Sequence, residues 1–221
     1  MSTALLEFLK NEQQRPQAIF LRQPFNGQWK EWTWQEAGIE CRKIAAALHS
    51  LQLPAGSHIA LLSKNCAHWL MADIAIMMAG CVSIPIYPTL TAASIQPILE
   101  HSDAKAIFIG KLDDFASQEA GIPSHLTRIG FDSYNRNEQY NWSELIAATA
   151  PLTEVHNWNP DDVFTIIYTS GTTGKAKGVM HTLGNVDATA STAIAELKLP
   201  MHPALFSYLP LSHIAERIGI E

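Results

Sequence analysis

The stretch 168–178 holds the residues of this chain best suited to chemistry, with the sequence Tyr-Thr-Ser-Gly-Thr-Thr-Gly-Lys-Ala-Lys-Gly. Its hydroxyls can donate hydrogen bonds, its lysines carry positive charge, and its glycines permit positive φ angles and close backbone approach to a ligand. The residues are the hydroxyls Thr169, Ser170, Thr172 and Thr173, the lysines Lys175 and Lys177, and the glycines Gly171, Gly174 and Gly178. Together these groups predict a loop that binds a polyphosphate.

This stretch differs from the P-loop of NTPases, G-x-x-x-x-G-K-[ST], in which a hydroxyl residue follows the lysine and binds Mg²⁺. Gly171 and Gly174 enclose two residues instead of four, and Ala176 follows Lys175. The apolar run that comes next predicts a strand, where a P-loop has a helix. A P-loop kinase or ATPase and a mobile turn between two strands are the alternatives.

A second stretch of interest is 207–217, which follows a predicted strand at 205–209. It contains His213, an imidazole that could contact a substrate. The alternative is that His213 caps a helix or lies in the core. Glu216 and Arg217 follow, and the plain interpretation of that pair is a solvated ion pair.

The 168–178 stretch resembles, nearly residue for residue, the signature loop of the adenylate-forming (AMP-binding) superfamily of acyl-CoA synthetases, luciferases and peptide-synthetase adenylation domains. The stretches 82–89 and 207–217 are similar to the long-chain fatty acyl-CoA synthetases of that superfamily. The resemblance extends from about Trp32 to Arg217. It implies that the chain is part of the large N-terminal domain of an adenylate-forming enzyme.

The implied activity is that of an AMP-forming long-chain fatty acid–CoA ligase. A fatty carboxylate attacks the α-phosphorus of ATP, pyrophosphate leaves, and the thiol of CoA opens the acyl-adenylate. The implied ligands are therefore fatty acid, ATP, Mg²⁺ and CoA. By resemblance, Thr169 binds phosphate or Mg²⁺, Thr169 and Lys175 act in catalysis, and His213 lies near the acyl and adenylate groups. The residues that bind the β- and γ-phosphates are Ser170, Gly171, Thr172, Thr173, Gly174 and Lys175.

The sequence is compatible with two further functions: an adenylate-forming ligase for aryl or medium-chain acids, and a non-catalytic nucleotide- or acyl-binding module. Several family parts are not found in these 221 residues. They are the Tyr-Gly-x-Thr-Glu segment with its Mg²⁺-binding Glu, the ribose-binding Asp, the hinge, and the C-terminal domain with its catalytic Lys. We therefore expect these residues alone to be inactive and the parent protein to be a ligase.

The elements that must position these residues alternate between strand and helix, which favours a doubly wound, mostly parallel α/β sheet flanked by helices. A strand pair at 18–21 and 28–32 turns at Asn26-Gly27. Further strands are predicted at 58–62, 81–86, 104–109, 126–131, 163–168 and 205–209. Helices are predicted at 33–53, 66–79, 92–100, 112–119, 142–148 and 186–197, with Thr33, Asn65, Thr91 and Asn185 as N-caps.

We expect residues 1–204 to form an α/β subdomain that ends with the phosphate loop and the helix after it. Residues 205–221 would begin a second, truncated α/β subdomain. Apolar surface between 205 and 220 would then lack its sheet partners, and exposed patches of this kind promote association. The sequence therefore predicts that these residues form dimers.

Composition excludes several classes of protein. With 47% hydrophobic and 16% charged residues the chain can bury a core, and a net charge of −6 without a basic cluster indicates no nucleic-acid partner. The N-terminus lacks the apolar region of a signal peptide. The segment 69–90 is interrupted by Asp73 and Gly80, which predicts a buried helix and strand instead of a membrane span.

Cys41, Cys66 and Cys81 lack the spacing of metal ligands and are predicted to be reduced, semi-buried thiols. Reduced thiols and the missing signal peptide indicate a cytoplasmic protein. The family resemblance adds the expectation of peripheral contact between the full-length protein and the inner face of the membrane.

Overall fold

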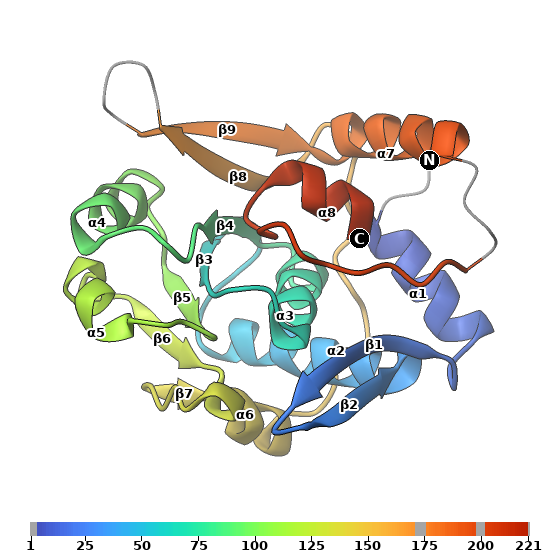
Figure 1. The fold of residues 1–221 in the computed structure, drawn as a ribbon, viewed down its shortest axis with the longest axis horizontal. Coiled ribbons are helices and arrows are strands. Elements are labelled where there is room, and N and C mark those ends of the chain that lie inside the picture. Colours follow the sequence, from blue (N-terminus) through green and yellow to red (C-terminus); the bar gives the residue numbers. More distant parts are fainter. Residues whose placement is uncertain (1–3, 171–175, 198–201, 221) are drawn as a thin grey trace.

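A seven-stranded sheet forms the centre of the computed structural model, which describes residues 4–170, 176–197 and 202–220 (Figure 1). The strand order is β7-β6-β5-β3-β4-β8-β9. Every neighbouring pair is parallel except β8 and β9, which are antiparallel. The prediction of a mostly parallel sheet flanked by helices is confirmed.

The strands of this sheet are β3 (His58–Leu62), β4 (Val82–Ile86), β5 (Ala106–Ile109), β6 (Thr127–Gly130), β7 (Tyr140–Asn141), β8 (Val163–Ser170) and β9 (Ala176–Thr182). A separate hairpin consists of β1 (Ile19–Phe25) and β2 (Gln28–Thr33). The helices are α1 (Ala4–Gln14), α2 (Trp34–Ser50), α3 (Ala67–Met78), α4 (Ala92–His101), α5 (Phe115–Gln118), α6 (Trp142–Ala148), α7 (Leu183–Leu197) and α8 (Ile214–Ile220).

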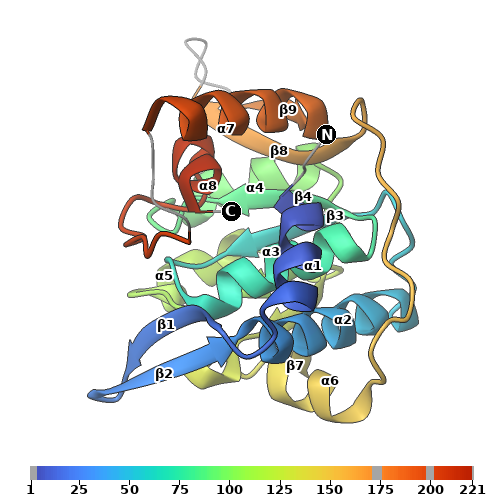
Figure 2. The same ribbon diagram turned by 90° about the vertical axis from the view of Figure 1, so that its right-hand side faces the viewer.

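Helices cover both faces of the parallel part of the sheet (Figure 2). Leu61 and Phe108 point from β3 and β5 into the core shared with α2 and α3. Leu62 and Ile109, the next residues of the same strands, point into the core shared with α4. Because both faces are buried, these strands are almost wholly apolar, as is usual for a covered parallel sheet.

Helix α3 is buried along its whole length. It packs against β3 and β4 on the sheet and is covered by α2, α1 and β1. The helix nevertheless carries His68 and Asp73, which are 3% and 0% exposed. A buried ionisable group needs a partner or a shifted pKa, so both residues bear on how the molecule is held together.

Two local predictions near the N-terminus are confirmed. Asn26 and Gly27 form the turn between β1 and β2 with φ angles of 49° and 79°, both positive as a tight hairpin turn requires. Thr33 caps α2 through a complete capping box: its hydroxyl accepts from the Glu36 backbone N–H, and the Glu36 carboxylate accepts from the Thr33 N–H. These hydrogen bonds also lower the pKa of Glu36.

The prediction that Asn65 caps α3 is wrong. The N-cap of this helix is Cys66, whose side chain makes no capping hydrogen bond. The backbone N–H of Ala67 donates instead to Gln23 Oε1 of β1, at 2.6 Å. A side chain from a distant strand therefore satisfies the helix end, which leaves Asn65 available for other contacts.

The predicted strand at 205–209 is also wrong, because these residues form no strand. Side chains, and not a neighbouring strand, provide hydrogen bonds for part of this backbone. The Tyr208 N–H donates to Glu216, and the Leu209 carbonyl accepts from Asn65. Phe206 and Tyr208 are 81% and 73% exposed. The predicted boundary between 204 and 205 and the dimer stay predictions.

Two helix starts differ from the sequence-based expectation. Helix α7 begins at Leu183 instead of 186, since the hydroxyl of Thr182, and not the side chain of Asn185, accepts a first-turn N–H. The helix predicted at 112–119 shrinks to α5, which begins after Asp114, whose carboxylate accepts from the Ser117 N–H.

Two expectations from composition can be compared with the structure. All three cysteines are free, and all are fully buried instead of semi-buried. Within the described ranges, no helix has both the length and the apolar character needed to cross a bilayer.

The capping box generates a stability prediction. Thr33→Ala removes a side chain that accepts the Glu36 N–H, so it should lower the free energy of unfolding by about 1 kcal/mol. Thr91→Ala is the matched control, because Thr91 is the N-cap of α4 but makes no side-chain cap bond to the backbone. Urea denaturation measures both, and equal losses would contradict the role given to the box.

His68 generates a pH prediction. Burial, with a smaller contribution from the charge of Lys30, lowers its pKa from 6.5 to about 4. The folded chain therefore binds fewer protons than the unfolded chain in this range, so stability is full above about pH 6.5 and falls as the pH decreases toward 4. The loss amounts to roughly 3 kcal/mol. His68→Gln should flatten this part of the stability curve; an unchanged curve would contradict the assignment.

Candidate functional site

Both ends of the predicted phosphate stretch lie in the antiparallel strands β8 and β9 (Figure 1). Thr169 and Ser170 end β8, where they pair with Lys177 and Ala176 of β9. The expected strand after the loop is thus confirmed. The predictions for Gly171, Thr172, Thr173, Gly174 and Lys175 fall outside the described residues.

The hairpin leaves the sheet at an edge where ligands commonly bind. Strand β8 runs parallel to β4, with Thr165 opposite Ser83, so Thr169 near the end of β8 lies at the carboxyl ends of the parallel strands. In open α/β sheets, ligands bind outside these carboxyl ends. The exposed Thr169 therefore lies at an edge of the sheet that suits ligand binding.

Thr169 and Lys177 are direct cross-strand partners, and both are exposed. This pairing sets a hydroxyl beside a positive charge, a combination that suits an anion. The whole hairpin, 163–182, contains no carboxylate. Among the described residues, no group of three or more His, Cys, Asp or Glu side chains is placed to hold a metal ion.

Tyr168 and Gly178 lie near the Ser170–Ala176 end of the hairpin, where Tyr168 links it to α4. They pair across the strands, and a Cβ on Gly178 would lie 3.1 Å from Tyr168 Cζ and 2.8 Å from Ile166 Cγ2. Tyr168 Oη lies 2.7 Å from Nδ1 of His101 on α4, and burial raises the pKa of Tyr168. The expected loop role of Gly178 is wrong: it lies within β9, its φ is not positive, and it makes room for an aromatic ring.

Arg217 is a functional candidate that the sequence interpretation missed. It is 1% exposed, so the expectation of a solvated Glu216–Arg217 pair is wrong. Its Nη2 pairs with Oδ2 of Asp73 on α3, and its Nη1 donates to Thr165 Oγ1 on β8 at 2.8 Å. The guanidinium lies 5.7 Å from the ring centroid of Trp69 and 5.2 Å from that of Phe164.

Glu216 and Asn65 hold the segment that precedes α8. The Glu216 carboxylate accepts from Ser207 Oγ at 2.8 Å and from the Tyr208 N–H at 2.9 Å. Asn65 donates to the Leu209 carbonyl and accepts from the Leu211 N–H. Four side-chain hydrogen bonds thus fix a stretch that lies outside the sheet.

His213 is exposed, and its Nδ1 accepts from the Ala215 N–H at 3.2 Å. The Glu216 and Arg217 N–H groups donate to the His213 carbonyl. His213 therefore occupies the start of α8, as the helix-capping alternative supposed. A role toward substrate stays a prediction.

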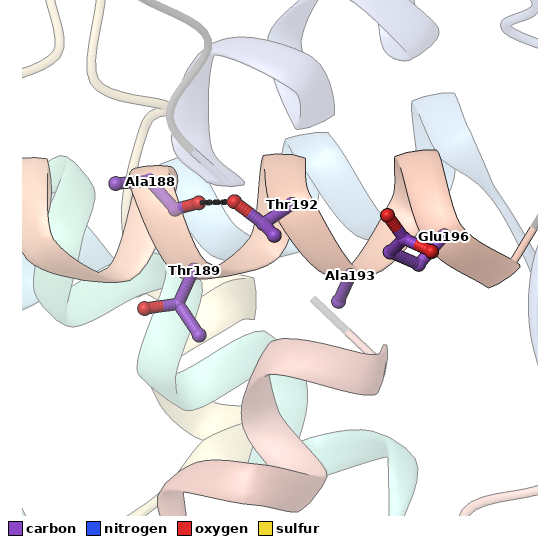
Figure 3. Close-up of a pocket in the computed structure, with 5 residues that line it drawn as sticks. All are labelled: Ala188, Thr189, Thr192, Ala193 and Glu196. Carbon is purple, nitrogen blue, oxygen red and sulfur yellow. Dashed lines mark hydrogen bonds between the residues drawn. The ribbon is translucent and has the colours of Figure 1, made fainter.

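A depression on the surface of α7 is lined by Ala188, Thr189, Thr192, Ala193 and Glu196 (Figure 3). All five residues come from one helix, so the depression is a helix surface instead of a cleft between elements. Thr192 Oγ1 donates to the Ala188 carbonyl at 2.8 Å. We assign no chemistry to it.

One signal in the sequence could have revealed the Arg217 contacts. Asp73 is the only ionisable residue besides His68 in the apolar helix α3, and a carboxylate in a buried helix requires a cation. What the sequence could not show is which cation fulfils this role, because Arg217 lies 144 residues further along the chain.

Comparison with known proteins identifies the family. A family profile described as "AMP-binding enzyme" matches residues 8–221, nearly the whole chain. The chain belongs to the AMP-binding enzyme family. This confirms the resemblance carried by the 168–178 stretch.

Curated members of the AMP-binding family resemble this chain at modest identity. The long-chain-fatty-acid–CoA ligase FadD15 of Mycobacterium bovis is 28% identical over 220 residues, which cover 94% of this chain and 36% of that protein. The peroxisomal long chain acyl-CoA synthetase 7 of Arabidopsis thaliana is 31% identical and covers 86% and 29%. The chain thus spans about a third of the length of these relatives.

A solved AMP-binding structure supports the fold. O-succinylbenzoate coenzyme A synthetase of Bacillus subtilis, in complex with AMP, superposes with a TM-score of 0.76 at 22% identity. The match covers 96% of this chain and 51% of that chain. At this identity the likeness shows a shared fold and leaves the substrate undecided.

The Tyr168–Gly178 contact generates a prediction. Gly178→Ala would gain about 0.4–1 kcal/mol from the stiffer unfolded chain, but its Cβ would meet Ile166 Cγ2 at 2.8 Å. Overpacking costs about 1–3 kcal/mol and should win, for a net loss of roughly 1 kcal/mol in urea denaturation. Val179→Ala, on the same strand but 43% exposed, is the control and should change little. A stabilising Gly178→Ala would refute the close-approach role.

Proposed function

We propose that the whole protein is an AMP-forming long-chain fatty acid–CoA ligase, to which this chain contributes the phosphate loop. The observation that carries the proposal is the β8–β9 hairpin, in which Thr169, at the carboxyl edge of the sheet, pairs with Lys177. Membership of the AMP-binding family supports the use of ATP. The names of the curated relatives favour a long-chain fatty acid as the second substrate.

The proposed role of the loop is electrostatic. As the fatty carboxylate attacks the α-phosphorus, negative charge builds on the departing pyrophosphate. Hydroxyls, backbone N–H groups and Lys175 would meet that charge where it develops, and preorganised groups of this kind contribute most to such steps. Thr169 and Lys177, paired side by side, would extend the same surface along the hairpin.

Magnesium would enter together with ATP. Thr169 offers an exposed oxygen of the kind Mg²⁺ accepts, but the hairpin supplies no carboxylate. Oxygen ligands from phosphate would therefore have to complete the coordination, as is common for Mg²⁺ in nucleotide sites. When bound, the ion neutralises phosphate charge, while Lys175 and the hydroxyls of this chain orient the nucleotide.

His213 would act at the acyl end of the site. Its imidazole is exposed at the start of α8, and α8 is fastened to β8 through Arg217 and Thr165. We propose that His213 positions the acyl-adenylate, after which the thiol of CoA completes the reaction. Lys175 and Thr169 are the groups proposed to act on ATP.

A non-catalytic acyl-binding module is less well supported. A cavity of about 50 Å³ lies among apolar side chains of α1, β1 and α3. Ligand pockets usually measure about 300–1,000 Å³, so this cavity is too small for a fatty chain. A ligase for aryl acids remains the second candidate, favoured by the fold shared with o-succinylbenzoate coenzyme A synthetase.

Pyrophosphate exchange into ATP tests the proposal in the whole enzyme. Lys175→Ala should lower the fatty-acid-dependent exchange rate by about tenfold to a thousandfold, since it removes charge where pyrophosphate departs. Lys105→Ala, an exposed lysine at the start of β5, is the control and should leave exchange unchanged. An unchanged rate in Lys175→Ala would refute the role of the loop.

The choice of acid separates the two ligase candidates. The wild-type enzyme should exchange pyrophosphate faster with a long-chain fatty acid than with benzoate at equal concentration. A preference for benzoate would favour the aryl-acid ligase, and transfer of γ-phosphate without exchange would favour a kinase.

A further inference from the structure

The hydroxyl of Thr165 is the meeting point of three buried groups. It accepts from Ser83 Oγ of β4 at 2.9 Å and from Arg217 Nη1 at 2.8 Å, and it donates to the Ser83 carbonyl at 3.0 Å. These three bonds use its one proton and both of its lone pairs. Thr165 is also five residues before Ser170, on the strand that leads into the phosphate loop.

Arg217 bridges this hydroxyl to Asp73. A lysine could not reproduce the bridge, because one ammonium is a point charge, whereas the guanidinium presents separate N–H donors in a rigid fork. The fork aims Nη1 at β8 and Nη2 at α3. The position of α8 is therefore tied to two elements at once.

A contribution to the free energy of unfolding does not by itself explain the buried ion pair of Asp73 and Arg217, because such pairs are often not net stabilising. Burying two charges carries a desolvation penalty that can exceed their attraction, and apolar replacements of such pairs are often neutral or stabilising. Both side chains are almost completely buried, at 1% and 0% exposure. What the pair supplies is direction, because one side chain of α8 bonds β8 through Nη1 and α3 through Nη2.

The same helix also holds the other end of the segment. Asn65, just before α3, bonds Ser207, Leu209 and Leu211, while Asp73 in the middle of α3 holds Arg217. His213 lies between these two anchors. The segment around His213 is thus held on one side by Asn65 and on the other by Asp73 through Arg217, and Arg217 also bonds Thr165 of β8.

We propose that Arg217 is a positioning residue that sets the place of His213 relative to β8 and its Thr169, acting through its hydrogen bond to Thr165. This inference rests on the proposed ligase function. In this proposal the guanidinium of Arg217 keeps His213, at the acyl end of the site, at a fixed distance from Thr169, at the nucleotide end.

The test uses the whole enzyme and four variants. Thr165→Val removes the bond to Arg217 while keeping side-chain shape and the ion pair. Ser83→Ala is the matched control, because it removes another buried bond to the same hydroxyl. Arg217→Lys keeps the charge for Asp73 without the fork. The double variant Asp73→Leu with Arg217→Met replaces the pair by apolar groups of similar size.

Three quantities are measured: the exchange rate per folded molecule, the KM for ATP, and hydrogen-exchange protection of residues 207–217. Thr165→Val, Arg217→Lys and the double variant should each lower the exchange rate by about tenfold to a hundredfold with an unchanged KM for ATP, as expected when a reacting group is misplaced. They should also lower the protection of 207–217 by about tenfold. Ser83→Ala should lower neither the exchange rate nor the protection of 207–217.

Two results would overturn the inference. One is equal behaviour of Thr165→Val and Ser83→Ala, and the other is a folded double variant with the wild-type rate and protection. If the wild-type enzyme shows no fatty-acid-dependent exchange, the proposed function fails instead, and hydrogen exchange alone decides whether Arg217 holds the segment through Thr165.

Discussion

The structure depends on one buried guanidinium. Arg217 brings a positive charge to the only carboxylate of helix α3, and neither charge could stay in the interior without the other. Because the same group also bonds β8, the chain can close its core only when α3, the central sheet and α8 meet in one arrangement. The apolar side chains around it, Trp69 and Phe164, supply area and shape but would allow small shifts. Direction comes from the polar bonds.

The site is built at the boundary between two kinds of sheet. The parallel strands β3, β4 and β5 are apolar on both faces and form a rigid support. The antiparallel hairpin β8–β9 is added at the side of β4, and its polar residues accumulate toward the tip. A Tyr–Gly pair near the Ser170–Ala176 end of the hairpin and a histidine of α4 hold the hairpin in place, so part of a motif associated with nucleotide binding has a structural role. Residues proposed to contact a ligand thus alternate with residues that support the hairpin within eleven positions.

Features whose causes lie within a few residues could be predicted from the sequence. The Asn26-Gly27 turn, the Thr33 capping box and the helix at 142–148 were correct because their hydrogen bonds are local. Predictions failed where distant partners decide. Gln23, and not Asn65, accepts a backbone N–H at the start of α3. Asn65 instead bonds the backbone of the 205–209 segment, where a strand was expected. The loop motif identified the family, yet no local pattern could show that Arg217 is buried.

The separation between the two buried charges has a consequence for synthesis of the protein. Asp73 leaves the ribosome 144 residues before its partner. At translation speeds of about 5–20 residues per second, this interval lasts roughly 7 to 30 s. During that time the apolar helix α3 carries a carboxylate whose partner Arg217 has not yet been made, so the ion pair forms only afterwards. A chaperone that binds exposed apolar helices would meet its substrate in this interval.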